Sequence, residues 1–94
     1  MPLYVVIHQH DPERCPAGDP DQAPRLLRYL SDSASSGITI HAEAMADGQH
    51  TLHMILEAAD AKTVRDFMTP FQVLGTVEVL PSSSCEAVVA RGRC

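Results

Sequence analysis

The sequence contains no tryptophan, only two tyrosines and two phenylalanines, and three cysteines in 94 residues. An odd number of cysteines cannot form a complete set of disulfides within one chain. No Cys-x-x-Cys pair occurs, so the cysteine spacing matches no strong zinc motif. Hydrophobic residues still make up 45% of the chain, which is enough for one small core. We therefore expect a single domain over residues 1–94, with thiols in place of a disulfide framework.

Positive charge is also scarce, and it is scattered along the chain. Seven basic residues against twelve acidic ones give a formal net charge of −5. This balance argues against nucleic acid and anionic membrane as partners. No apolar run approaches the roughly 18 residues that a membrane span requires. The start of the chain, residues 1–6, lacks the basic and long apolar regions of a signal peptide, so we expect a cytoplasmic location.

The common catalytic motifs are missing too. The sequence has no Gly-x-Ser-x-Gly, no phosphate-binding glycine-rich loop and no His-Glu-x-x-His. A nucleophilic pair between Cys15 and His8 or His10 is chemically conceivable, but a loop is a poor platform for positioning it. The sequence therefore leaves open whether the protein is an enzyme.

The segment from Ile38 to Glu57 shows the most informative pattern. Apolar and polar residues alternate on both sides of an Ala-Asp-Gly turn, which is typical of two strands with one buried face and one open face. A three-residue loop with Gly48 in the left-handed conformation keeps the two apolar sets on the same face. In that register His41 lies opposite His53, with Cβ atoms about 4.5–5.5 Å apart.

The rest of the chain supplies two helices and three further strands. Asp19 and Asp60 are suited to cap helix N-termini, Gly37 to end the first helix, and Pro70 to break the second. The expected elements are a strand over Leu3–His8, a helix from Asp19 to Gly37, a helix from Asp60 to Thr69, a strand over Thr76–Leu80 and a strand over Glu86–Ala90.

This order predicts an α+β fold of the ferredoxin-like βαββαβ type. Its antiparallel sheet has the spatial order 4-1-3-2, with both helices on one face. The core is expected over residues 3–80, and residues 81–94 form a C-terminal extension that ends in a short strand or tail.

The fold determines which histidines meet. We assign Leu3, Val5 and Ile7 to the core face of the first strand. Its other face then carries His8, followed by His10 if the strand continues. Because the first strand neighbours the third in this topology, His8 and His10 are expected near the histidines of the central hairpin, on the sheet face without helices.

The element order and one-sided sheet resemble the dimeric α+β barrel superfamily, over about residues 3–80. More narrowly, Met1-Pro2-Leu3-Tyr4-Val5-Val6, Cys15-Pro16, Phe67-Met68 and Cys85 resemble a set of small bacterial proteins of uncertain function. The superfamily includes cofactor-free monooxygenases, nickel-binding proteins and heme-active enzymes. The resemblance implies a homodimer whose subunits pack their open sheet faces together.

We predict that the converging histidines bind a transition-metal ion. His8, His41 and His53 are the main candidate ligands, with His10 and Cys15 as secondary candidates, because neutral imidazole and thiolate bind such ions well. Copper or zinc is the favoured ion, and nickel is a further alternative. The protein would then buffer, deliver or sense a metal.

Other interpretations stay open at this point. The histidines could be exposed groups on a polar sheet face, or hydrogen-bonding groups in a dimer interface. His50, on the core-facing side near the turn, is predicted to be a partly buried hydrogen-bonding residue. The competing function is an enzyme resembling cofactor-free monooxygenases, with a small-molecule pocket on the same face, and a third is a purely structural interaction module.

Overall fold

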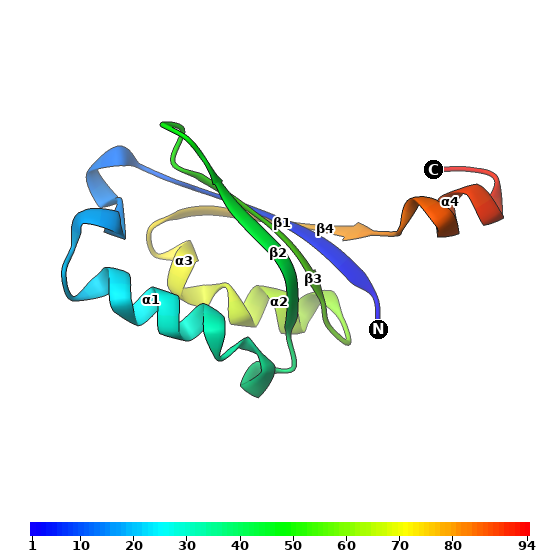
Figure 1. Ribbon diagram of the computed structural model, residues 1–94, viewed down its shortest axis with the longest axis horizontal. Helices are drawn as coiled ribbons and strands as arrows, with labels where there is room; N and C mark the ends of the chain where they lie inside the picture. Colours follow the sequence, from blue (N-terminus) through cyan, green and yellow to red (C-terminus); the bar gives the residue numbers. More distant parts are fainter.

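The computed structural model describes residues 1–94 and is organised around a four-stranded antiparallel sheet (Figure 1). The spatial order is β2-β3-β1-β4, which is the predicted order. Each neighbouring pair is antiparallel. The strands are β1 (Leu3–His10), β2 (Thr39–Ala46), β3 (Thr51–Glu57) and β4 (Gly75–Ser82). The predicted ferredoxin-like α+β class is confirmed.

Three helices lie on one side of this sheet, and short 3-10 turns flank the first of them (Figure 1). The Asp60 carboxylate accepts a hydrogen bond from the Thr63 amide at 2.8 Å, so it caps α2 as expected. Pro70 lies at the start of α3 and separates it from α2. The helices are α1 (Gln22–Ser31), α2 (Ala61–Phe67) and α3 (Thr69–Gln72), and the turns are η1 (Pro12–Arg14), η2 (Pro16–Gly18) and η3 (Ser33–Ser36).

The core lies between the sheet and these helices, and it reverses the predicted faces of β1. Tyr4, Val6, His8 and His10 are buried, whereas Leu3, Val5 and Ile7 are only half-buried. The buried set of β1 residues lies opposite the buried residues of β3, and side chains that are paired across two strands share one face of the sheet. The pairs are Tyr4–Leu56, Val6–Met54 and His8–Leu52.

The hairpin register also differs from the prediction. Ala46 pairs with Thr51, so the loop spans residues 47–50, and a bulge lies between Ile40 and Ala42. An irregularity of this kind shifts the register by one residue and exchanges the faces beyond it. His53 therefore lies opposite Ala44 rather than opposite His41.

The C-terminal segment forms a helix, α4 (Cys85–Arg91), where the sequence predicts a strand. The Ser84 hydroxyl accepts from the Ala87 amide at 3.1 Å, and Gly92 ends the helix in the left-handed conformation. These two caps outweigh the strand preference of Val88 and Val89. In Figure 1 α4 projects away from the sheet. None of the helices combines the length and hydrophobicity needed to cross a membrane.

Candidate metal centre

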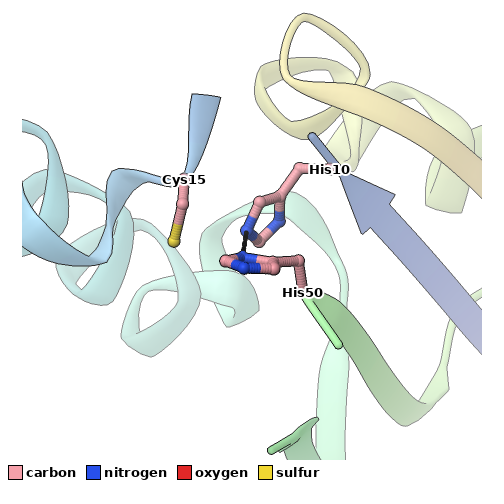
Figure 2. A group of neighbouring side chains, drawn as sticks. All are labelled: His10, Cys15 and His50. Carbon is pink, nitrogen blue, oxygen red and sulfur yellow. Dashed lines mark hydrogen bonds between the residues drawn. The ribbon is translucent and has the colours of Figure 1, made fainter. Parts of the chain in front are cut away.

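Three side chains with metal-binding atoms meet at the end of the sheet where β1 stops (Figure 2). They are His10 at the end of β1, Cys15 between η1 and η2, and His50 in the β2–β3 loop. Their ligand atoms all lie within 4.8 Å of one another. His10 is 5% exposed, and the other two are half-buried. The cluster is thus partly shielded from water and still reachable from it.

Backbone contacts hold His10 and His50 side by side. The His10 amide donates to the His50 carbonyl oxygen at 3.1 Å, which joins the end of β1 to the hairpin loop. On the other side of β1, His10 pairs with Gly75 of β4. A Cβ atom at Gly75 would overlap the Gln9 carbonyl oxygen and lie 2.7 Å from the His10 Cα. Only glycine therefore allows β4 to lie so close to His10.

His50 has an unusual backbone conformation. Its φ of 52° makes it the only residue other than glycine with a positive φ. For a residue with a Cβ atom, the left-handed conformation costs roughly 1–2 kcal/mol. Such strain is concentrated at functional positions, where the surrounding structure holds it in place. In this conformation the His50 ring lies beside His10, with its Nδ1 3.3 Å from His10 Nε2.

The loop that carries Cys15 is held by one local and one long-range hydrogen bond. The Cys15 amide donates to the Pro12 carbonyl oxygen at 3.4 Å, which closes η1. The guanidinium of Arg14 donates to the Val73 carbonyl oxygen at 3.3 Å, and so ties the loop to the segment before β4. Cys15 forms no disulfide. These contacts place its thiol beside the two imidazoles (Figure 2).

A chain of hydrogen bonds assigns the tautomers of the buried histidines. A carbonyl oxygen can only accept, so His8 Nδ1 must donate to the Thr76 oxygen, 3.0 Å away. The neutral His8 ring then has a bare Nε2, which accepts from His10 Nδ1 at 3.3 Å. His10 Nε2 consequently carries the lone pair of that ring. It accepts a hydrogen bond from His50 Nδ1 at 3.3 Å, on the side of the cluster. A metal ion bound between the two nitrogens would take the place of this hydrogen, and the His50 proton would move to Nε2.

Burial keeps both rings in this neutral form. Burial is the largest cause that lowers the pKa of His8, with the Thr76 hydrogen bond opposing it and His10 adding to it. Burial also lowers the pKa of His10, which His50 lowers further and Asp11 partly restores. Because a metal ion binds the unprotonated imidazole, these shifts favour ligation at neutral pH.

The spacing of the two imidazole nitrogens suits a tetrahedral ion. Metal–nitrogen bonds of about 2.0–2.1 Å place two nitrogen ligands roughly 3.3–3.4 Å apart at tetrahedral angles. His10 Nε2 and His50 Nδ1 are 3.3 Å apart. The Cys15 sulfur, which lies within 4.8 Å of both nitrogens, could provide a third, softer ligand and leave a fourth position open. The His10 ring would donate its other nitrogen to His8, as ligating histidines commonly do to a second group.

Water can reach the cluster from one side. A polar hollow of about 440 Å³ lies beside His10 and His50, and none of its lining residues is hydrophobic. Gln9, Asp11 and Gly48 are among the residues around it. A hydrated ion therefore has a polar path to the ligand atoms.

The predicted ligands are divided between two regions of the molecule. His10 and Cys15 belong to the cluster, and His8 lies behind His10. His41 and His53 are exposed on the sheet, and His41 Nε2 lies 3.1 Å from a Glu57 carboxylate oxygen. The predicted meeting of His8 with these two histidines on the open face is wrong, because the side chain of His8 is on the helix-covered face of β1.

His50 is the ligand candidate that sequence reasoning missed. The alternation placed it correctly as a partly buried, hydrogen-bonding residue on the core side. The same alternation placed Leu52 in the core, where the structure has it. Because His8 pairs with Leu52 across β1 and β3, the buried face of Leu52 would have placed His8 and His10 on the core side of the sheet, where His50 lies.

Fold and site together define an α+β protein of the ferredoxin-like type with a group of His and Cys residues that could hold a metal ion. The chain belongs to the family described as a domain of unknown function, DUF3303, which matches residues 2–93. Among curated proteins the chain has no match. Because the family carries no assigned activity, its function has to be argued from the site.

Proposed function

We propose that this protein binds a transition-metal ion through His10 Nε2, His50 Nδ1 and the Cys15 sulfur. The observation that supports this most strongly is the relay from Thr76 through His8. It fixes the lone pair of His10 on Nε2, and the other two potential ligand atoms, from separate segments of the chain, lie within 4.8 Å of that nitrogen. His8 would act as a positioning residue that fixes the tautomer of His10.

The donor set favours zinc or copper. A thiolate and two imidazoles are soft to borderline ligands, which suit Zn²⁺ and Cu⁺, whereas Mg²⁺ and Ca²⁺ prefer oxygen ligands. Nickel also binds imidazole and remains an alternative. With three protein ligands the ion keeps an open position, which structural zinc sites normally close. This supports a role in buffering, delivering or sensing the metal, in a reducing compartment such as the cytoplasm.

A metal titration followed by intact mass measurement tests this function. Metal-free protein would be titrated with Zn²⁺ and, under reducing conditions, with Cu⁺. The test variants are Cys15→Ser and His50→Gln, and the matched controls are Cys85→Ser and His53→Gln, whose side chains are exposed. We expect the test variants to lose at least about 100-fold in affinity, because removing a ligand costs more than the roughly 10–100-fold lost with an outer-shell partner, and the controls to bind as the wild type does. Equal binding by test and control variants would contradict the site.

We also propose that two copies pair through the open sheet face, as in dimeric α+β barrels. Ile55 and Leu80 remain 46% and 40% exposed on this face, Val5 lies between them, and Ile7 follows Val5 along the same face of β1. A stable interface of standard size buries about 800 Å² on each partner. Light scattering should give a dimer for the wild type and a monomer for Ile55→Lys. A wild type that stays monomeric at high concentration would refute the pairing.

A further inference from the structure

An apolar groove lies between α1 and the sheet and ends at the candidate metal centre. Its volume is about 320 Å³, and nine of its twelve lining residues are hydrophobic. Leu26, Leu27 and Leu30 of α1 form one wall. Met45, Leu52 and Phe71 form the opposite wall, and the remaining side chains that carry polar atoms are His10, Cys15 and Glu43. The groove and the metal centre thus share two side chains.

The groove lies beside an α1 helix that packs only partly against the core. Tyr29 stacks on Phe67 of α2, with ring centroids 4.9 Å apart, and its hydroxyl donates to the Phe67 carbonyl oxygen at 2.7 Å. Leu26 and Leu30 also contact the core and stay half-buried. Although this helix has an apolar side, it buries none of its residues completely.

Apolar side chains on both walls therefore stay in contact with water. Leu27 is 69% exposed and Met45 is 48% exposed. A ligand that filled the space would remove this surface from water, at roughly 25 cal/mol for each Å² buried. Pockets that bind small molecules range from about 300 to 1,000 Å³ and combine apolar walls with a few polar groups at one place. This groove is at the small end of that range.

A metal ion held at the His10–Cys15 end of the groove would determine the head group of the ligand. Zn²⁺ bound by one thiolate and two neutral imidazoles carries a net charge of +1, and one coordination position stays open. An anionic oxygen ligand would neutralise this charge and occupy the open coordination position. We propose that the groove binds a small apolar carboxylic acid, whose chain lies between α1 and β3 and whose carboxylate binds the metal.

This inference rests on the proposed metal site. It adds that the metal and the apolar acid bind to the same state of the protein and strengthen each other. Without the metal, the carboxylate would face the acidic side chain of Glu43 and no cationic residue of the lining, in a chain whose formal net charge is −5. By linkage, the factor by which zinc strengthens acid binding equals the factor by which the acid strengthens zinc binding.

Octanoate is a suitable probe because it has both a carboxylate and an apolar chain. Acetate has the carboxylate without the long chain, and octanol has the chain without the carboxylate. Calorimetry would measure each of them against metal-free and zinc-loaded protein. We expect octanoate to bind the zinc-loaded form about 5–150-fold more tightly than the metal-free form, the usual range for two coupled ligands. Acetate and octanol should each bind more weakly than octanoate.

A variant of the groove separates it from the metal centre. Leu27→Glu places a charge on an exposed wall residue and should abolish octanoate binding while zinc binding stays unchanged. The matched control is Val89→Glu on α4, where the valine is 78% exposed and distant from the groove. This control should behave as the wild type with both ligands.

The outcomes distinguish the two proposals. If zinc binds but octanoate does not, or if octanoate binds equally with and without zinc, the groove proposal is overturned and the metal site stands. If octanol binds as tightly as octanoate, the carboxylate has no role and the proposal is again overturned. If zinc itself does not bind, both proposals fail.

Discussion

Metal binding should stabilise the fold, because the three ligands come from segments that only the folded chain brings together. Cys15 and His50 are 35 positions apart in the sequence, and one backbone hydrogen bond joins the loop of His50 to the end of β1. A bound ion would add a second link at this place. Any species that binds the native state and not the unfolded state raises the free energy of unfolding.

The size of the effect follows from the affinity. At a free zinc concentration of about 100 times Kd, the stabilisation is about 2.7 kcal/mol. For a domain of about 60–100 residues, each kcal/mol raises Tm by about 4–8 °C. Saturating zinc should thus raise Tm by about 10–20 °C. Residual binding to His8, His10 and Cys15 in the unfolded chain, where they are close in sequence, moves the result toward the lower end.

Thermal unfolding followed by circular dichroism, with zinc and with a chelator, measures this shift. His50→Gln should reduce the shift to about a quarter or less, because an affinity loss of about 100-fold removes most of the linkage energy. His53→Gln should keep the full shift. The reasoning is refuted if zinc leaves the wild-type Tm unchanged, or if His50→Gln responds as strongly as His53→Gln does.

Three other predictions concern the protein without metal. Asparagine tolerates the left-handed conformation, so His50→Asn should leave the free energy of unfolding in urea unchanged or raise it by up to about 1 kcal/mol. The same variant should lose metal binding. A clear loss of stability would argue against strain at this position. The pKa values of His8 and His10 are lowered on folding, so their neutral forms contribute stability that is fully present above the unfolded pKa of about 6.5 and is lost as pH falls below it. Urea unfolding at a series of pH values should show this decline, and a His10→Gln variant should show a shallower one; equal slopes would contradict the assignment. Gly75→Ala should destabilise the fold by about 1–3 kcal/mol, as overpacking does, because its Cβ would overlap the backbone of β1. Wild-type stability in that variant would show that β4 can move away from His10 freely.

The sequence predicted the fold well because the signals for the elements are local. The cap at Asp60, the break at Pro70 and the order of strands and helices all follow from neighbouring residues. The buried side of β3 followed from its alternation, since only one of its faces is apolar. These signals were enough to predict the sheet order and the helix-covered face of β3, but not that of β1.

The site could be predicted only in part, because it depends on which face of β1 is buried. Both faces of β1 carry apolar residues, so alternation does not distinguish Leu3, Val5 and Ile7 from the set that contains Val6 and His8. The choice is made by pairing with β3, which is a long-range contact. The bulge near His41 and the loop over residues 47–50 shifted the hairpin register for a similar reason, since no local pattern marks either of them.

Cobalt substitution tests the central claim most directly, because it reports the geometry and the sulfur ligand in one spectrum. Metal-free protein loaded with Co²⁺ should show strong visible absorption of a four-coordinate ion and a near-ultraviolet sulfur-to-cobalt band. Cys15→Ser should lose the sulfur band, and Cys85→Ser should keep it. A weak six-coordinate spectrum in the wild type, or a sulfur band that survives Cys15→Ser, would contradict metal binding at His10, Cys15 and His50.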